Sequence, residues 1–151
     1  MREILFRGKR LDNGEWVFGM LTGYGKKVAQ IGTFCDYGTH ICSISSLGVY
    51  PNTVGQFTGL TDKNGKRIFE GDIVRATIRR DEGYAENIRN EKGVIAFDSL
   101  GMIGLMLDRT GNNIPVWSDF FCELSLSGNI LDYCFELIGN IHDNPELLER
   151  G

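Results

Sequence analysis

A predominantly β fold is what this sequence predicts: a small barrel-like core of short antiparallel strands, with an N-terminal β-meander and a short C-terminal helix. Short runs of β-branched and aromatic residues alternate with turn residues at intervals of roughly 8–12 positions, a spacing typical of sandwiches and barrels. The chain also has 20 glycines against 3 prolines. That ratio suits many tight turns and leaves little room for long helices.

The first fifty residues are expected to form the meander, because each apolar alternation is followed by a turn signal. In order, we expect a strand around Ile4 and Phe6, a hairpin turn at 12–14, a strand with Trp16, Phe18 and Met20 on one face, a turn at 23–26, a short strand at 27–31, and irregular chain at 32–48 with one short strand at 40–44. Gly19 lies opposite that apolar face, where a missing side chain leaves space for another backbone or an aromatic ring.

Residues 51–151 are expected to form the barrel-like region, with the barrel itself at about 51–141, and to make one compact unit with the meander. Asp62 to Gly65 places Asp, Asn and Gly where a hairpin loop needs a positive φ. Gly71 marks a bend, and the Asp72 carboxylate is expected to hold that bend by accepting backbone N–H groups. The predicted core residues here are Val54, Phe57, Leu60, Ile68, Phe69, Ile73 and Val74.

The remaining elements have weaker signals. We expect a strand at 73–78, a solvated charged loop or loose helical turn at 79–92, strands at 93–97 and 102–107 around a turn at 98–101, a turn at 109–113, a short strand at 114–117, one helical turn at 118–124, a last strand at 133–138, and a short helix opened by Asn144, Pro145 and Glu146.

Four segments also resemble a known family. The longest is T-V-G-Q-F-T-G-L-T-D-K-N-G-K-R-I-F-E-G-D at 53–72, and the others are F-R-G-K at 6–9, E-W-V-F-G at 15–19 and I-G-N-I-H-D-N-P-E-L-L at 138–148. Through these segments the chain resembles the YopX protein family of bacteriophages and prophages. The resemblance implies a mostly β fold with a barrel-like core in a phage-encoded protein, and it brings no catalytic residues with it.

Composition narrows the classes of function. The formal net charge is −4, which argues against a protein whose affinity comes mainly from neutralising phosphates. No apolar run approaches the ~18 residues that a membrane span needs, and no signal peptide is visible. We therefore expect a protein of the bacterial host's cytoplasm. Its four cysteines are expected to be reduced and partly buried.

Two groupings were weighed as chemical sites. Cys35, His40 and Cys42 are zinc-ligand types, but their spacing is unfamiliar and no second ligand pair follows, so buried thiols and a surface histidine are preferred. Glu70 and Asp72 resemble an acid–base pair, yet carboxylates around a glycine bend more often serve the turn. We expect no enzyme activity, no metal and no cofactor.

A binding role remains. Basic residues interleaved with aromatics mark a candidate nucleic-acid surface, because small β-barrels bind single strands in such grooves; its residues are Arg7, Lys9, Arg10, Lys63, Lys66, Arg67, Arg75, Arg79 and Arg80. The favoured interpretation is a non-enzymatic binding or assembly module that associates with copies of itself through β-rich surface. A nucleic-acid-binding accessory protein is the alternative, and the sequence leaves any small-molecule ligand unidentified.

Overall fold

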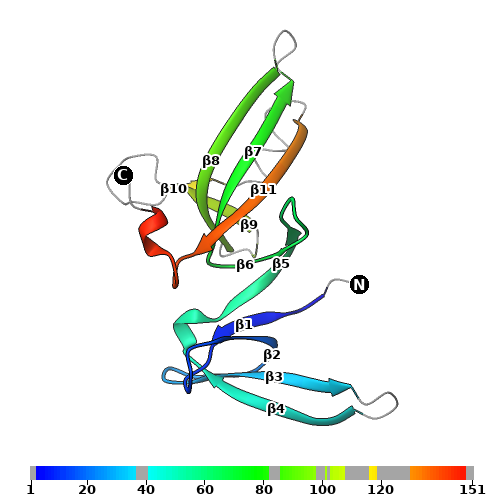
Figure 1. Cartoon of the computed structure of the whole chain (residues 1–151), viewed down its shortest axis with the longest axis vertical. Helices are drawn as coiled ribbons and strands as arrows, with labels where there is room; N and C mark the ends of the chain where they lie inside the picture. Colours follow the sequence, from blue (N-terminus) through cyan, green and yellow to red (C-terminus); the bar gives the residue numbers. More distant parts are fainter. Residues whose placement is uncertain are drawn as a thin grey trace. The chain divides into compact units, whose positions relative to one another are not determined.

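The computed structural model describes residues 3–36, 41–81, 86–97, 101, 103–107, 116–118 and 130–148. The chain divides into two compact units, Met1–Gly59 and Leu60–Gly151, so the boundary expected at residue 50 lies inside the first unit. Figure 1 shows the elements, which are β1 (Phe6–Lys9), β2 (Trp16–Tyr24), β3 (Ala29–Asp36), β4 (Ile41–Val49), η1 (Pro51–Thr53), β5 (Gly55–Thr61), β6 (Arg67–Phe69), β7 (Asp72–Asp81), β8 (Glu86–Phe97), β9 (Ile103–Leu107), β10 (Val116–Ser118), β11 (Ile130–Asn140) and η2 (Pro145–Leu148).

The mainly β prediction is confirmed, but the single barrel is wrong. The described strands form two antiparallel sheets in the orders β4-β3-β2-β1-β5-β6 and β10-β9-β8-β7-β11, without a closed barrel. The central motif is divided between them, because β5 pairs with β1 whereas β7 pairs with β8 and β11. The bend at Gly71, where φ is +83°, separates the strands of one sheet from those of the other.

The N-terminal meander is present as β1 to β4, each strand antiparallel to the next. Ala29, Ile31 and Val49 are fully buried at its centre. Gly14 has the positive φ, +71°, that the first hairpin turn requires. The expectation for Gly19 is also confirmed, because a Cβ there would lie 2.2 Å from the Gly32 carbonyl oxygen.

Irregular chain with one short strand at 40–44 was predicted for residues 32–48; a strand is present there, but it is longer than predicted, and most of the described chain around it is also strand. β3 continues to Asp36 and β4 starts at Ile41; residues from Ala29 to Asp36 pair with those from Val49 to Ile41, with one register shift between Thr33 and Cys35. Serines and glycines in this segment hide the apolar alternation, whereas the backbone ladder needs only an adjacent strand in the right register. Residues 37–40 lie outside the described chain.

The second unit has its own core, formed by Ile68, Val74, Ala76, Ile95, Leu105 and Phe135. Of the predicted core residues, Phe57, Ile68, Phe69, Ile73 and Val74 are buried. A common core for the whole set is wrong, because Val54 packs against the cluster of the first unit and Leu60 against that of the second.

Residues 79–81 and 86–92 of the charged stretch are strand, not the expected loop or helical turn, and residues 82–85 lie outside the described chain. β7 runs to Asp81 and β8 starts at Glu86, so the two strands form a long hairpin (Figure 1). Their ladder continues without a register shift from the pair Ile73 and Val94 to the pair Asp81 and Glu86. Strands already aligned by a buried base can extend through polar sequence, because the ladder satisfies their backbone groups.

The C-terminal helix prediction is also wrong. Residues Pro145–Leu148 form a single 3₁₀ turn, in which the Leu147 N–H donates to the Asn144 carbonyl at 3.1 Å. Four residues are too few to propagate an α-helix. The turn expected at 109–113 lies outside the described residues, as does the helical turn expected at 118–124 except for Ser118, which is the last residue of β10. Within the part of the chain that is described, no helix is long and apolar enough to cross a membrane.

Candidate functional site

The turn at the centre of the family-like motif is held by one carboxylate. Oδ1 of Asp62 accepts the backbone N–H groups of Asn64 and Lys66, both at 2.8 Å, while Gly65 has φ +80°. Burial of Asp62, which is 6% exposed, raises its pKa. The N–H groups of Lys66, Asn64 and Leu137 lower it, and they prevail, so the pKa of Asp62 is below its ordinary value.

The same turn lies against β11. The Lys63 N–H donates to the Phe135 carbonyl at 2.8 Å, and the Leu137 N–H donates to the Asp62 carboxylate. β11 is the last strand in the order of its sheet. A turn far away in the sequence therefore occupies backbone groups of an edge strand, which are the groups most exposed to unwanted pairing.

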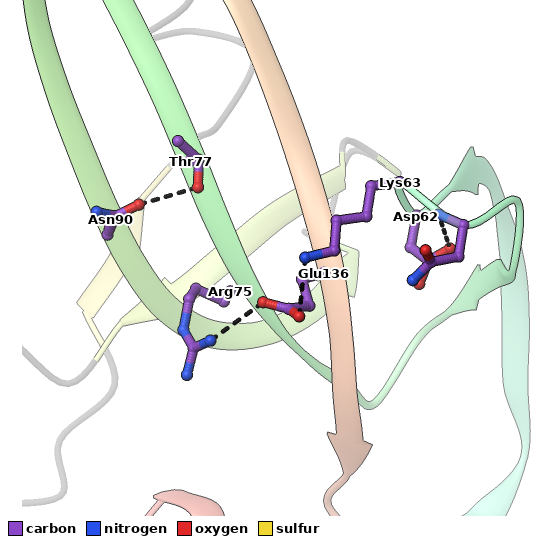
Figure 2. Close-up of polar contacts among 7 residues, drawn as sticks. Asp62, Lys63, Arg75, Thr77, Asn90 and Glu136 are labelled. Atoms are coloured by element: carbon purple, nitrogen blue, oxygen red, sulfur yellow. Dashed lines mark hydrogen bonds and ion pairs between the residues drawn. The ribbon is translucent and has the colours of Figure 1, made fainter.

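Glu136 joins two of the predicted basic residues (Figure 2). Its carboxylate oxygens lie 2.9 Å from Lys63 Nζ and 3.1 Å from Arg75 Nη1. The hydrogen bond from Lys63 is the largest of the effects that lower the pKa of Glu136. Glu136 was not predicted as a site residue, because no motif marks it and its partners are 73 and 61 residues away.

A second pair of predicted cations lies in the first unit. The Arg7 guanidinium carbon is 4.6 Å from the centroid of the Trp16 ring, and Lys9 Nζ is 5.6 Å from the same ring. Arg7 is only 7% exposed. Both are cation–π distances, so the indole ring organises these two side chains on one face of β1 and β2.

The rest of the predicted basic surface is dispersed. Arg10 binds Asp12 through Nε at 2.9 Å, and the Lys66 and Arg67 side chains are exposed. Arg79 and Arg80 belong to β7, but their side chains lie outside what the structure describes. The structure thus brings Lys63 and Arg75 together around Glu136, and Arg7 and Lys9 together around Trp16, in different units.

The outward face of β2 carries exposed apolar side chains. Phe18 is 48% exposed and Met20 45% exposed. As residues i and i+2 of one strand, they point to the same side of the sheet. Across the ladder, Phe18 lies opposite Arg7, and Met20 lies opposite Gly32. Phe18 and Met20 are called the β2 apolar pair below.

The end of the longest family-like segment and the segment at 138–148 contain structural joints of the second unit. Oδ2 of Asp72 accepts the Phe69 N–H at 2.8 Å, which confirms that Asp72 holds the bend. The Ile141 N–H donates to the Gly71 carbonyl at 3.0 Å, so the bend contacts the turn that follows β11. In that turn, Oδ1 of Asn140 accepts the N–H groups of His142 and Asp143, each at 3.0 Å.

The side chains of the candidate zinc ligands Cys35, His40 and Cys42 are not described by the structure. Among the described residues, no three His, Cys, Asp or Glu side chains are grouped so that they could hold a metal ion. Cys35 and Cys42 are register partners in β3 and β4, but their side chains, like His40 and Cys122, lie outside the described set. The expectation of burial is wrong for Cys134, which is an exposed free cysteine.

Comparison with known proteins links the chain to one family. The family model described as YopX protein matches residues 5–149. No curated protein and no solved structure gives a significant match. The match includes every family-like segment, from F-R-G-K at residue 6 to the last turn of the chain. Because it covers nearly the whole length, the chain belongs to the YopX protein family.

Proposed function

We propose that this is a non-enzymatic binding or assembly module, encoded by a phage or prophage, that associates with copies of itself through the outward face of β2. The observation that carries the proposal is the β2 apolar pair, two large side chains about half exposed on one strand. Apolar side chains grouped on one surface mark interaction sites more often than isolated ones do. Closed symmetric dimers are the commonest assemblies that such a surface forms.

The neighbours of the pair support contact with a flat apolar partner. Gly32, opposite Met20, contributes no side chain, so a residue of a second copy has room to pack beside the Met20 thioether. Opposite Phe18, the guanidinium of Arg7 lies against the Trp16 ring. Burying the exposed half of a Phe or Met side chain contributes about 1 kcal/mol, so the pair anchors an interface that needs further contacts around it.

Sedimentation velocity at micromolar concentration tests the proposal. We expect a species larger than the 16.9 kDa chain, unaffected by reductant or chelator. The double variant Phe18→Ser/Met20→Ser should weaken association at least about tenfold, because it removes both anchors. Val28→Ser is the control, since Val28 is an apolar residue of the same unit, 42% exposed, outside the pair. A wild-type protein that stays monomeric up to about 100 µM contradicts the proposal, and a species dissolved by chelator contradicts the account of what holds it together.

The nucleic-acid-binding alternative has one observation in its favour. Trp16, Phe18, Lys9 and Arg7 share one face of β1 and β2, and sheets that bind single strands combine aromatic and basic side chains in this way. Against it stand the net charge of −4 and the use of Lys63 and Arg75 as partners of Glu136.

Retention on single-stranded DNA columns decides between the two functions. A phosphate-driven binder is retained at low salt and released steeply as salt rises. Lys9→Gln should then reduce retention, whereas Lys26→Gln, an exposed lysine in the turn after β2, serves as the control. No retention at low salt eliminates the alternative.

A further inference from the structure

The outer edge of β11 has a backbone geometry suited to strand pairing. In an extended strand, the C=O of one residue and the N–H of the residue two positions later point to the same edge. On β11 the Phe135 carbonyl and the Leu137 N–H are two such groups, and they point to the same edge of the strand. Both are bound by the turn after β5: the carbonyl by the Lys63 N–H at 2.8 Å, and the N–H by the Asp62 carboxylate.

The turn therefore imitates a neighbouring strand. The Lys63 N–H occupies the place of a strand donor, and the Asp62 carboxylate occupies the place of a strand carbonyl. The Lys63 side chain adds a contact, because its Nζ lies 2.9 Å from Glu136 on the same stretch of β11. Asp62 is buried by this arrangement, and its carboxylate also closes the turn itself through Asn64 and Lys66.

We propose that the turn at residues 62–66 is an edge cap: it closes a latent strand-pairing surface on β11 whose occupant, once the cap is displaced, is β11 of a second copy. The N–H and C=O groups of a strand edge are a template for another extended backbone, so a β-strand is the partner chemistry that fits. The cap thus controls whether the second unit joins an intermolecular sheet.

A second copy of β11 is compatible with this edge. The backbone N–H and C=O of Phe135 point to the outer edge of β11. In a symmetric antiparallel pair centred on this residue, Phe135 lies opposite Phe135 of the second copy. Position 136 then lies opposite position 134, so Glu136 faces Cys134 and not another carboxylate. In this pairing, therefore, no two like charges face each other across the strands at the positions next to residue 135.

The test uses two substitutions at one position. Lys63→Pro removes the N–H that reaches Phe135, together with the Glu136 ion pair. It keeps the turn, because proline is favoured at this second position of a β-turn. Lys63→Ala removes the ion pair alone and is the matched control. We expect Lys63→Pro to strengthen self-association at least about tenfold by sedimentation velocity, because it removes one of the bonds that hold the turn against β11, with Lys63→Ala close to wild type. A folded Lys63→Pro protein that associates no more than Lys63→Ala overturns the proposal.

Amide hydrogen exchange tests the cap without depending on the folding of a variant. In wild type the Leu137 N–H should exchange at least about a hundredfold more slowly than an unprotected amide, because it is bonded to a buried carboxylate. Exchange at the unprotected rate overturns the cap. The association experiment is repeated with Phe18→Ser/Met20→Ser also present. Enhanced association that persists there belongs to β11, and enhancement that disappears there belongs to the β2 face and overturns the role of β11.

Discussion

At the scale of single residues, small polar groups and glycines define the joints of this protein. Asp62 closes a turn and bonds to β11 with one carboxylate. Asp72 holds the bend that leads into β7, and Asn140 organises the turn after β11. Each satisfies backbone N–H groups that would otherwise be left without acceptors where strands end.

Asp62 makes stability depend on acid. Its folded-state pKa is lower than the ordinary value of 3.8, so its contribution is complete above the unfolded-state pKa and is lost as the pH falls through the folded-state pKa. We expect Asp62→Asn, whose Oδ1 can still accept both turn N–H groups, to lose less stability than wild type between about pH 5 and pH 2. Urea denaturation across that range measures the effect.

The control for this prediction is Glu146→Gln, which changes an exposed carboxylate in η2. In this variant, the loss of stability as the pH falls should be the same as in wild type. Equal acid dependence in wild type and Asp62→Asn would show that the charge of Asp62 does not stabilise the turn.

Gly139 is required by close packing. A Cβ at this position would lie 2.7 Å from Asn144 Oδ1 and 2.8 Å from Leu147 Cδ1. Gly139→Ala should therefore destabilise the protein by about 1–3 kcal/mol, the usual cost of overpacking. Gly23→Ala is the control, because its Cβ would meet only the flexible Gln30 side chain, at 3.2 Å. Equal denaturation midpoints for the two variants would contradict this packing.

At the scale of elements, β5 carries a buried aromatic residue whose backbone bonds to the start of the chain. Phe57 is 6% exposed, and its N–H donates to the Leu5 carbonyl at 2.8 Å. Phe57→Ala should cost about 3–5 kcal/mol, because it leaves a cavity in a packed region. Tyr50→Ala, which truncates a side chain 46% exposed, is the control for aromatic truncation. An unchanged denaturation midpoint for Phe57→Ala would show that Phe57 is not part of a core.

The hairpin of β7 and β8 shows how an element can form without an apolar alternation. At its base, Arg75 lies between Glu136 and Lys92 across the ladder, and Thr77 Oγ1 donates to Asn90 Oδ1 at 2.9 Å (Figure 2). On the other face, Val74 and Ala76 are fully buried in the core. One buried face at the base of the hairpin is enough to set the register of the two strands. The polar residues farther along β7 and β8 then pair in the same register.

At the scale of the whole molecule, the described strands form two antiparallel sheets, and the two units have separate buried clusters. Far-ultraviolet circular dichroism should therefore be dominated by strand signal, with no substantial helical component. A spectrum dominated by helix would contradict both the sequence-based fold class and the two sheets.

The sequence by itself determined the local chemistry of this protein: its mainly β class, its family, the turns at Gly14 and Gly65, and the bend at Gly71. These features depend on a few neighbouring residues, whose backbone preferences act over short distances. The interpretation of the basic residues as one surface had no such local basis, because the partners of Lys63 and Arg75 are distant in the sequence.

Only the tertiary structure decided which strand pairs with which, and hence that two sheets replace one barrel. Strand pairing depends on backbone groups common to all residues, so the sequences of β4 and β8 carry little record of it. The same reason hid Glu136 and the contact of the turn at 62–66 with β11. The two cations bound to Glu136 are 61 and 73 residues away from it, and the fold alone brings them within hydrogen-bonding distance.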